Sequence, residues 1–289
     1  MYSSEVNTQH PNVEKKNFTF AVVGNPNSGK STVFNQLTGM RQKVGNFPGV
    51  TVDKKLGKVQ LEGKREVTLI DFPGIYSFYP TSQDERIVVQ TFTNPKDENY
   101  PDAVIYVADV NRLEKHMLLF TQVKDLGLPV ILALNMADQA EKEGIEIDAD
   151  YLANEIKTPV VPISGRTGAG FDRLKKEMFL VMLEHSQHNP VNSKLFFQFD
   201  AKEKRIARSI AEVADAGTDF QAMLLAHHYQ WLPFLKESQK QIIGERVQES
   251  GFVSLRQQVD EIMLRYDIFT PIVQTALRKG KRRSSNTLT

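Results

Sequence analysis

The feature that most constrains this chain is residues 18–32, which read FTFAVVGNPNSGKST. A strand-like apolar run ends at Gly24, and a polar turn leads into a helix-forming segment at residues 31–37. The turn fits G-x-x-x-x-G-K-[ST], a loop whose backbone N–H groups converge on a phosphate at the positive end of the following helix. A glycine-rich turn that merely contains Lys-Ser is the weaker alternative. The predicted phosphate-binding residues are Gly24, Asn25, Pro26, Asn27, Ser28, Gly29, Lys30, Ser31 and Thr32.

Two side chains give this loop its chemistry. Lys30 adds a point charge on the outer phosphates of a nucleotide, and the Ser31 hydroxyl is a hard oxygen ligand for Mg²⁺. The loop therefore predicts a nucleoside-triphosphate site that uses Mg²⁺. It does not by itself say which base is bound.

Composition limits the remaining choices. The chain has 289 residues, enough for one large domain or two modest ones, and a formal net charge of +1, which gives no bulk attraction to nucleic acid. It has no cysteine, which excludes disulfides, zinc fingers and iron–sulfur ligation. No run of about eighteen apolar residues predicts a membrane-spanning helix. Residues 1–16 are polar and predict a flexible lead rather than a secretory signal.

Strand-like and helical segments alternate over residues 17–184, which predicts an α/β domain with a mostly parallel sheet flanked by helices. In such sheets ligands bind beyond the carboxyl ends of the strands. Residues 39–53 are rich in turn formers and predict a loop. The predicted strands are 54–61, 66–70, 103–108, 130–134 and 160–163, and the predicted helices are 31–37, one from about 84, 113–126 and 171–183.

The second half of the chain has a different pattern. Residues 185–194 are polar and turn-rich and predict a linker, and residues 195–278 predict a small all-α subdomain after a brief strand-like run at 195–199. Residues 279–289 form a basic tail. The predicted helices are 201–214, 220–228, 235–248 and 253–268. His227 and His228 are expected to be an exposed helical pair rather than a metal site, and Trp231 and Phe234 to be subdomain core.

Two further stretches bear on the phosphates. Asp71 ends a predicted strand about forty residues after the loop, in the pattern D-x-x-G, and can accept a hydrogen bond from a water on Mg²⁺. The N–H of Gly74 can contact a terminal phosphate. Thr51 can complete the Mg²⁺ shell through its hydroxyl, although Thr51 simply beginning a strand stays open. The residues assigned to these stretches are Asp71, Phe72, Pro73 and Gly74, and Gly49, Val50 and Thr51.

The base is predicted from N-x-x-D at residues 135–138. A carboxylate at Asp138 can accept from both N1–H and the 2-amino group of guanine, a donor pair that adenine lacks. Asn135 is expected to bond the base edge and tie the loop together, although an asparagine-capped helix start fits this stretch alone. A backbone N–H at residues 164–166 is placed to meet the guanine oxygen. The base-site residues are Asn135, Met136, Asp138, Ser164, Gly165 and Arg166.

Together these motifs resemble the translation-factor-related GTPases with a Ras-like fold, over residues 18–183. The runs GNPNSGKST, VGNFPGVTVD, DFPGIYSFYP and NMAD in combination are similar to the cytoplasmic N-terminal region of the bacterial ferrous-iron transport proteins of the FeoB family. In that family the GTPase domain precedes a small helical domain and a polytopic membrane domain. The resemblance covers nearly the whole chain and is more specific in the first half.

The resemblance implies a GTP-binding and GTP-hydrolysing regulatory module of a ferrous-iron transporter, in which two switch loops signal to the helical subdomain. It implies a place at the cytoplasmic face of the bacterial inner (plasma) membrane, with the chain itself soluble. The implied partners are the transporter's own membrane domain, absent from this chain, small accessory Feo proteins and further copies of the chain in a homo-oligomer. No nucleic-acid partner is expected.

The residue after D-x-x-G is Ile75, where Ras-like enzymes have a glutamine that orients the attacking water. Arg41, at the start of the predicted loop, is a candidate for an arginine finger. The resemblance instead implies a K⁺ ion that neutralises charge between the β- and γ-phosphates, bound by Asn27 and by the backbone carbonyls of Gly45 and Phe47. Asn27 as a plain turn residue stays open. The residues expected to act in a slow, K⁺-stimulated hydrolysis are Asn27, Lys30, Thr51 and Gly74.

Two other functions stay open at this point. The first is a soluble ribosome- or RNA-associated GTPase of the Era or MnmE type, which would add an RNA-binding element such as a KH domain; no GXXG loop is found after residue 184. The second is a nucleotide sensor without turnover, in which Ile75 accounts for the missing hydrolysis. Phosphate release measured in K⁺ separates an enzyme from a sensor.

Overall fold

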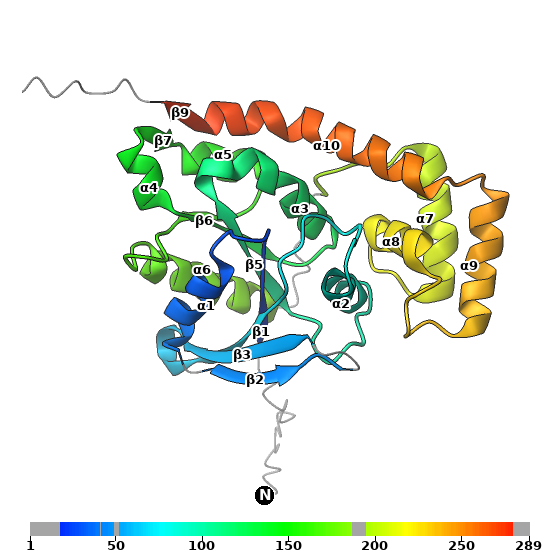
Figure 1. The fold of residues 1–289 in the computed structure, drawn as a ribbon, viewed down its shortest axis with the longest axis horizontal. Helices are drawn as coiled ribbons and strands as arrows, with labels where there is room; N and C mark the ends of the chain where they lie inside the picture. Colours follow the sequence, from blue (N-terminus) through cyan, green and yellow to red (C-terminus); the bar gives the residue numbers. More distant parts are fainter. Residues whose placement is uncertain (1–17, 41, 49–51, 187–194, 280–289) are drawn as a thin grey trace, which may run out of the picture.

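The computed structural model describes residues 18–40, 42–48, 52–186 and 195–279. Its strands are Thr19–Val23 (β1), Gln42–Asn46 (β2), Asp53–Gln60 (β3), Glu66–Asp71 (β4), Ala103–Asp109 (β5), Val130–Asn135 (β6), Ile145–Ile147 (β7), Val160–Pro162 (β8) and Leu277–Lys279 (β9). Seven of them form one sheet in the order β2-β3-β4-β1-β5-β6-β8 (Figure 1). The strands from β4 to β8 in this order run parallel, and β3 runs antiparallel to both β2 and β4.

Helices cover both faces of this sheet. The helices are Lys30–Thr38 (α1), Gln83–Phe92 (α2), Leu113–Asp125 (α3), Ala137–Lys142 (α4), Ala149–Ile156 (α5), Phe171–Ser186 (α6), Ala201–Ala214 (α7), Asp219–His228 (α8), Glu237–Glu249 (α9) and Ser254–Ala276 (α10), with 3-10 turns at Glu62–Lys64 and Val110–Arg112. The predicted α/β class, a Ras-like fold with a mostly parallel sheet and a helical region after it, is confirmed.

The two-residue period of β1 explains why both faces are covered. Phe20 and Val22 join a core that contains residues of α1 and α6, whereas Ala21 and Val23 join a core with residues of α2 and α3 on the opposite face. A strand with apolar side chains on both faces is stable only when helices bury both. The apolar runs of the sequence therefore become the central strands.

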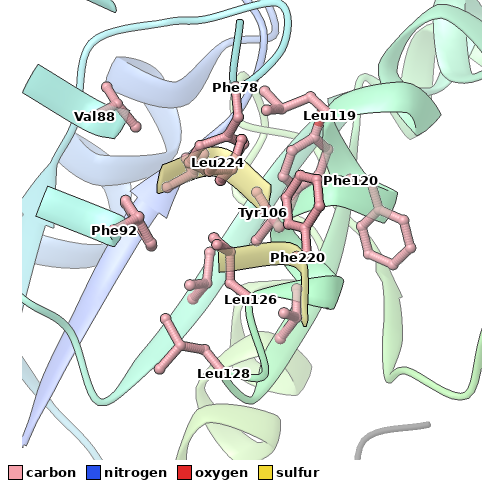
Figure 2. Packing of buried hydrophobic residues seen from close by; sticks show 14 of the residues in the cluster. Phe78, Val88, Phe92, Tyr106, Leu119, Phe120, Leu126, Leu128, Phe220 and Leu224 are labelled. Atoms are coloured by element: carbon pink, nitrogen blue, oxygen red, sulfur yellow. The ribbon is translucent and has the colours of Figure 1, made fainter. Parts of the chain in front are cut away.

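The second of these cores continues into the helical region. Figure 2 shows Phe220 and Leu224 of α8 packed with Phe78 and Phe92. The rings of Phe78 and Phe220 lie 6.3 Å apart, nearly perpendicular to each other. The helices after residue 195 thus complete the same apolar core that covers one face of the sheet.

The last long helix returns to the sheet domain. α10 crosses α3 and α5, and β9 after it pairs antiparallel with β7 (Figure 1). Among the described residues, no helix is both long enough and apolar enough to cross a bilayer. The contacts of α10 place the end of the described chain beside the sheet domain rather than beside α7 to α9.

Four expectations need correction. The predicted loop at 39–53 contains β2, because its backbone pairs with β3 although its exposed residues show no alternating pattern. Residues 195–199 form no strand, because the N–H groups of Phe196 and Phe197 bond to a carboxylate instead of a neighbouring strand. The last helix runs eight residues beyond 268, through Pro271, which lies at an exposed position.

The fourth correction concerns the histidines of α8. His228 is buried and its Nε2 donates to the carbonyl of Phe78 at 2.9 Å, while His227 is half-buried and bonded to Ser254 and Gln257. Most residues of α8 are buried on every side of the helix, so it has no broad solvent face for the pair. The predicted lead (1–16), most of the linker (187–194) and most of the basic tail (280–289) lie outside the described residues.

Candidate nucleotide-binding site

The phosphate-binding loop joins β1 to α1 and has the backbone conformation that its glycines permit. Gly29 has φ 86° and Asn27 has φ 63°, both in the left-handed region. A Cβ on Gly24 would lie 2.3 Å from the carbonyl oxygen of Val107, so only glycine fits there. α1 has neither a side-chain cap nor an acidic residue in its first turn. Its first N–H groups are therefore free to bind an anion.

The D-x-x-G stretch lies directly against this loop. A Cβ on Gly74 would lie 3.0 Å from the Pro26 nitrogen and 3.1 Å from Nζ of Lys30. Lys30 is buried; burial lowers its pKa, and the nearby carboxylate of Asp71 opposes that shift. The structure thus brings a buried cation and two backbone segments to the place expected for the outer phosphates.

Asp71 and Ser31 supply oxygen atoms beside Lys30. The Ser31 hydroxyl lies 3.5 Å from Oδ2 of Asp71, and Oδ1 of Asp71 is buried without a hydrogen-bond partner among the described residues. Burial raises the pKa of Asp71, and Lys30 opposes the shift. Within the described ranges no three His, Cys, Asp or Glu gather to hold a metal by themselves. Two hard oxygens with one unsatisfied atom fit Mg²⁺, which also takes waters and phosphate oxygens as ligands.

On the base side, Asn135 connects three segments. Its Nδ2 donates to the Ser28 carbonyl at 3.0 Å, and its Oδ1 accepts from the N–H of Gly165 at 2.9 Å. The side chain is buried, so these bonds are shielded from water. Asn135 at the end of β6 therefore holds the phosphate-binding loop and the loop at 164–166 in one arrangement.

A cavity of about 370 Å³ opens beside Asn135. Asp138 in the first turn of α4 lies in its wall, and its Oδ2 accepts from Nε of Arg166 at 3.2 Å and from Nη2. The hydrogen bond from Arg166 holds the pKa of Asp138 below its usual range, with the Ser164 hydroxyl as the second cause. The residues lining the cavity are Gly29, Thr32, Asn135, Met136, Asp138, Gln139, Lys142, Gly165 and Arg166.

For several predicted site residues the structure shows a structural position, and others are not described. Gly49, Val50, Thr51 and Arg41 lie outside the described residues. The Phe72 side chain is buried in the core, 5.3 Å from the ring of Phe47, so Phe72 can reach a nucleotide only through its backbone. Of the residues expected to bind K⁺, Asn27 is exposed in the phosphate-binding loop, Gly45 is paired in β2 and the Phe47 side chain is core.

The sequence reasoning missed three residues of the site. The Tyr106 hydroxyl lies 2.7 Å from Oδ1 of Asn25 and 2.6 Å from the His116 carbonyl, so the buried ring holds the phosphate-binding loop from β5. Gln139 and Lys142 line the base cavity. Lys142 could have been found from its position one helical turn after Asp138. Tyr106 had no sequence signal.

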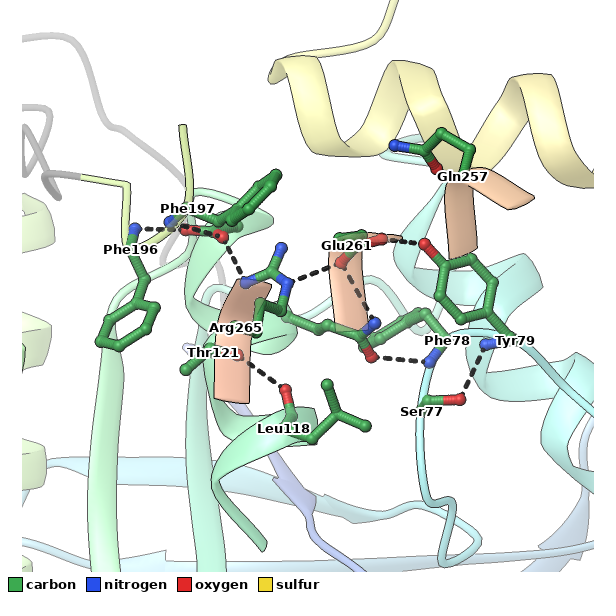
Figure 3. A network of polar contacts seen from close by, with 12 residues as sticks. Ser77, Phe78, Tyr79, Leu118, Thr121, Phe196, Phe197, Gln257, Glu261 and Arg265 are labelled. Carbon is green, nitrogen blue, oxygen red and sulfur yellow. Dashed lines mark hydrogen bonds and ion pairs between the residues drawn. The ribbon is translucent and has the colours of Figure 1, made fainter. Parts of the chain in front are cut away.

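The segment after D-x-x-G is fixed to the helical region (Figure 3). Ile75 is fully buried. The N–H of Phe78 donates to Oε1 of Gln122 at 2.9 Å, and its carbonyl accepts from His228, whose ring is neutral at pH 7 because burial lowers its pKa to about 4. The Tyr79 hydroxyl donates to Glu261 of α10.

Glu261 belongs to a buried ion network. It accepts from Nε of Arg265 at 2.6 Å, and Nη1 of Arg265 donates to Asp125 of α3 at 2.7 Å (Figure 3). Burial lowers the pKa of Arg265, but the two carboxylates outweigh it and the pKa lies above its usual value. The guanidinium also lies over the rings of Phe197 and Phe220, 4.9 Å from each centroid. Charge, aromatic and backbone contacts thus join α3, α10 and the end of the D-x-x-G segment.

A parallel sheet with a phosphate-binding loop after β1, a D-x-x-G stretch after β4 and an N-x-x-D stretch after β6 defines a Ras-like P-loop GTPase-type fold. The family model described as "Ferrous iron transport protein B" matches residues 18–178, more than half of the chain. The chain belongs to this family.

Individual relatives agree with this membership. The Fe(2+) transporter FeoB of Salmonella typhimurium is 44% identical over 164 residues, which cover 55% of this chain and 21% of that protein. The chain therefore spans about a fifth of the length of the curated relatives it matches. The cytosolic domain of L. pneumophila FeoB is 31% identical with a TM-score of 0.70, and that of T. maritima FeoB in a GDP form is 27% identical with a TM-score of 0.67. The first covers 90% of this chain and 100% of that domain, and the second covers 91% and 99%.

Proposed function

We propose that this chain binds GTP and hydrolyses it to GDP and phosphate, as the regulatory module of a ferrous-iron membrane transporter. The observation that carries the proposal is the position of Asp138, whose carboxylate lines a cavity bounded by Gly29 of the phosphate-binding loop. In a nucleotide whose phosphates lie on that loop, the edge of the base faces Asp138. Guanine presents two hydrogen-bond donors to this carboxylate. The relatives' names support the transport role, and the GDP form of T. maritima FeoB supports the guanine nucleotide.

In the proposed mechanism the chain positions the phosphates and stabilises their charge. Lys30 and the N–H groups at the start of α1 hold the β- and γ-phosphates. Ser31, Thr51 and, through water, Asp71 would hold Mg²⁺, which would neutralise charge on the phosphate oxygens. Gly74, which packs against the phosphate-binding loop, offers its N–H to the γ-phosphate. Loss of that phosphate removes one bond that orders the segment after Asp71.

Because the buried, apolar Ile75 cannot orient water, we propose a slow intrinsic rate and a K⁺ ion as the second source of positive charge. Asn27 and the backbone carbonyls of Gly45 and Phe47 would bind it. Phosphate release should then be faster in K⁺ than in Na⁺. Equal and measurable rates in the two salts would reject the K⁺ site but not the GTPase. No release over hours in either salt would support the alternative of a nucleotide sensor, which Ile75 favours.

We further propose that the D-x-x-G segment reports the nucleotide state to the helical region. Hydrogen bonds join Phe78 to Gln122 of α3 and to His228 of α8, and Tyr79 to Glu261 of α10. These bonds support the route, because a movement of Gly74 would displace a segment that is bonded to all three helices. In this arrangement residues 17–184 act as the GTPase domain and residues 195–278 as the helical domain that receives the signal.

The full-length protein would lie at the cytoplasmic face of the bacterial inner membrane, with its membrane transport domain as principal partner. Accessory Feo proteins and a homo-oligomer are proposed as further partners. Competition binding tests the central claim: GTP and GDP, but not ATP, should displace a fluorescent guanine nucleotide, and Asp138→Asn should remove that preference. Displacement by ATP as strong as by GTP would reject the guanine assignment.

A further inference from the structure

Residues 164–166 were expected to offer a backbone N–H to guanine. The side chain of Arg166 in addition bonds the carboxylate that is proposed to read the base. Its Nε and Nη2 both donate to Oδ2 of Asp138. The two side chains line the same cavity beside the phosphate-binding loop. The fork of a guanidinium suits this bond, because two N–H groups point in fixed directions.

Guanine and Arg166 need the same oxygen. Guanine presents two neighbouring donors, N1–H and the 2-amino group, and a carboxylate meets them with one oxygen each. A carboxylate oxygen has two lone-pair sites, and two N–H groups of Arg166 occupy both sites of Oδ2. A guanine base that pairs with both oxygens of Asp138 must therefore displace the Arg166 side chain.

The backbone beneath Arg166 is not free to move away with it. The N–H of Gly165 is bonded to Asn135, and Asn135 is bonded to Ser28 of the phosphate-binding loop. A Cβ on Gly165 would lie 3.0 Å from Cγ2 of Thr32, so this loop is closely packed on α1. The side chain of Arg166, which is 66% exposed, is the part that can swing out into solvent.

We propose that Arg166 is a latch on Asp138 that competes with guanine and so weakens nucleotide retention. The proposal rests on the proposed function, in which Asp138 reads guanine. An ion pair this exposed resists displacement only modestly, so the latch weakens binding by about twofold to fivefold. Its effect depends on the base: hypoxanthine has N1–H but no 2-amino group, can pair with Oδ1 alone, and leaves Arg166 in place.

The test compares GDP with inosine diphosphate on the full chain. Dissociation constants of both are measured for the unmodified chain, Arg166→Ala, Arg166→Lys and the control Arg173→Ala, which removes an exposed arginine of α6 away from the base cavity. Arg166→Ala should raise the preference for GDP over inosine diphosphate about twofold to fivefold, with slower GDP release. Arg166→Lys keeps the charge without the fork and should shift the preference in the same direction. Arg173→Ala should leave the preference unchanged.

Each result decides between the two claims. An unchanged preference in Arg166→Ala, or weaker GDP binding, overturns the latch while leaving the GTPase proposal intact. Asp138→Asn distinguishes the failures: if it does not weaken GDP binding, the guanine assignment fails and the latch fails with it. If Arg166 acts through Asp138, adding Arg166→Ala to Asp138→Asn should not change the preference for GDP over inosine diphosphate any further.

Discussion

Substitution Arg265→Met tests whether the buried ion network between α3 and α10 holds the structure together. Arg265 is fully buried, and its nitrogens lie 2.7 Å from Asp125 and 2.6 Å from Glu261. Methionine is unbranched and apolar, so it fills part of the space of the arginine side chain but leaves two buried carboxylates without a counter-charge. Breaking a buried pair in this way costs about 3–5 kcal/mol, a large share of the ~5–15 kcal/mol by which a typical domain is stable.

The same substitution should change how stability depends on pH. Burial already raises the pKa of Asp125 above 3.8, although Arg265 opposes the shift. A carboxyl whose pKa is raised by folding binds its proton more tightly in the native state, so its contribution to stability falls as the pH rises from the unfolded to the folded pKa. Without Arg265 that pKa rises further. As the pH rises from about 4 to about 7, the free energy of unfolding of the variant should therefore fall more than that of the unmodified chain.

Urea denaturation followed by the fluorescence of Trp231, the single tryptophan, measures both effects. The matched control is Arg256→Met, because Arg256 pairs with Asp260 on the exposed side of α10 and should contribute at most about 1 kcal/mol. Replacing Asp125 and Glu261 by their amides in the Arg265→Met background should recover much of the loss. A cost for Arg265→Met below about 1 kcal/mol, or an unchanged pH dependence, would refute the reasoning.

Three other changes test the site. Gly24→Ala drives a Cβ to within 2.3 Å of the Val107 carbonyl and should abolish nucleotide binding measured by fluorescence; full binding would contradict the loop geometry. Tyr106→Phe leaves Asn25 without its partner in β5 and should cost about 1–3 kcal/mol in urea denaturation, and a neutral effect would show that the hydroxyl is dispensable. Asn27→Asp should blunt the K⁺ stimulation of phosphate release, on the order of tenfold, while hydrolysis in Na⁺ stays near that of the unmodified chain.

The sequence predicts the motif stretches well because their chemistry needs neighbouring residues. A phosphate-binding loop is one turn with glycines at fixed places, so residues 24–31 contain all that specifies it. The supports of that loop come from elsewhere. Tyr106 is 81 positions from Asn25, and Asn135 is 107 positions from Ser28. The N-x-x-D motif indicated that Asn135 would bond the loop, whereas no motif indicated the contact of Tyr106 with Asn25.

The missed strands lie at edges where side-chain pattern is weak. In the part of the chain that the structure describes, β2 pairs on one side, with β3, and its described side chains are exposed, so nothing required alternate apolar residues. β7 and β9 have three residues each, and among the described residues they pair only with one another. Central strands of a parallel sheet must be apolar on both faces, whereas an edge strand is held mainly by its backbone bonds. Sequence patterning therefore located the strands with buried apolar residues, including the edge strand β8, and missed β2, β7 and β9.

The wrong expectation for His228 arises from a partner that is distant in the sequence, and it bears on function. Two adjacent histidines on a helix suggest a solvated pair, but the segment at residues 75–79 is an irregular stretch with buried backbone that must find partners. Gln122 supplies the acceptor for the N–H of Phe78, and His228 supplies the donor for its carbonyl. The burial of His228, in a helix without a motif, is thus explained by the hydrogen bond that it donates to a backbone carbonyl distant in the sequence. Here that backbone directly follows the D-x-x-G stretch, so the helical region contributes to the geometry of the proposed phosphate site.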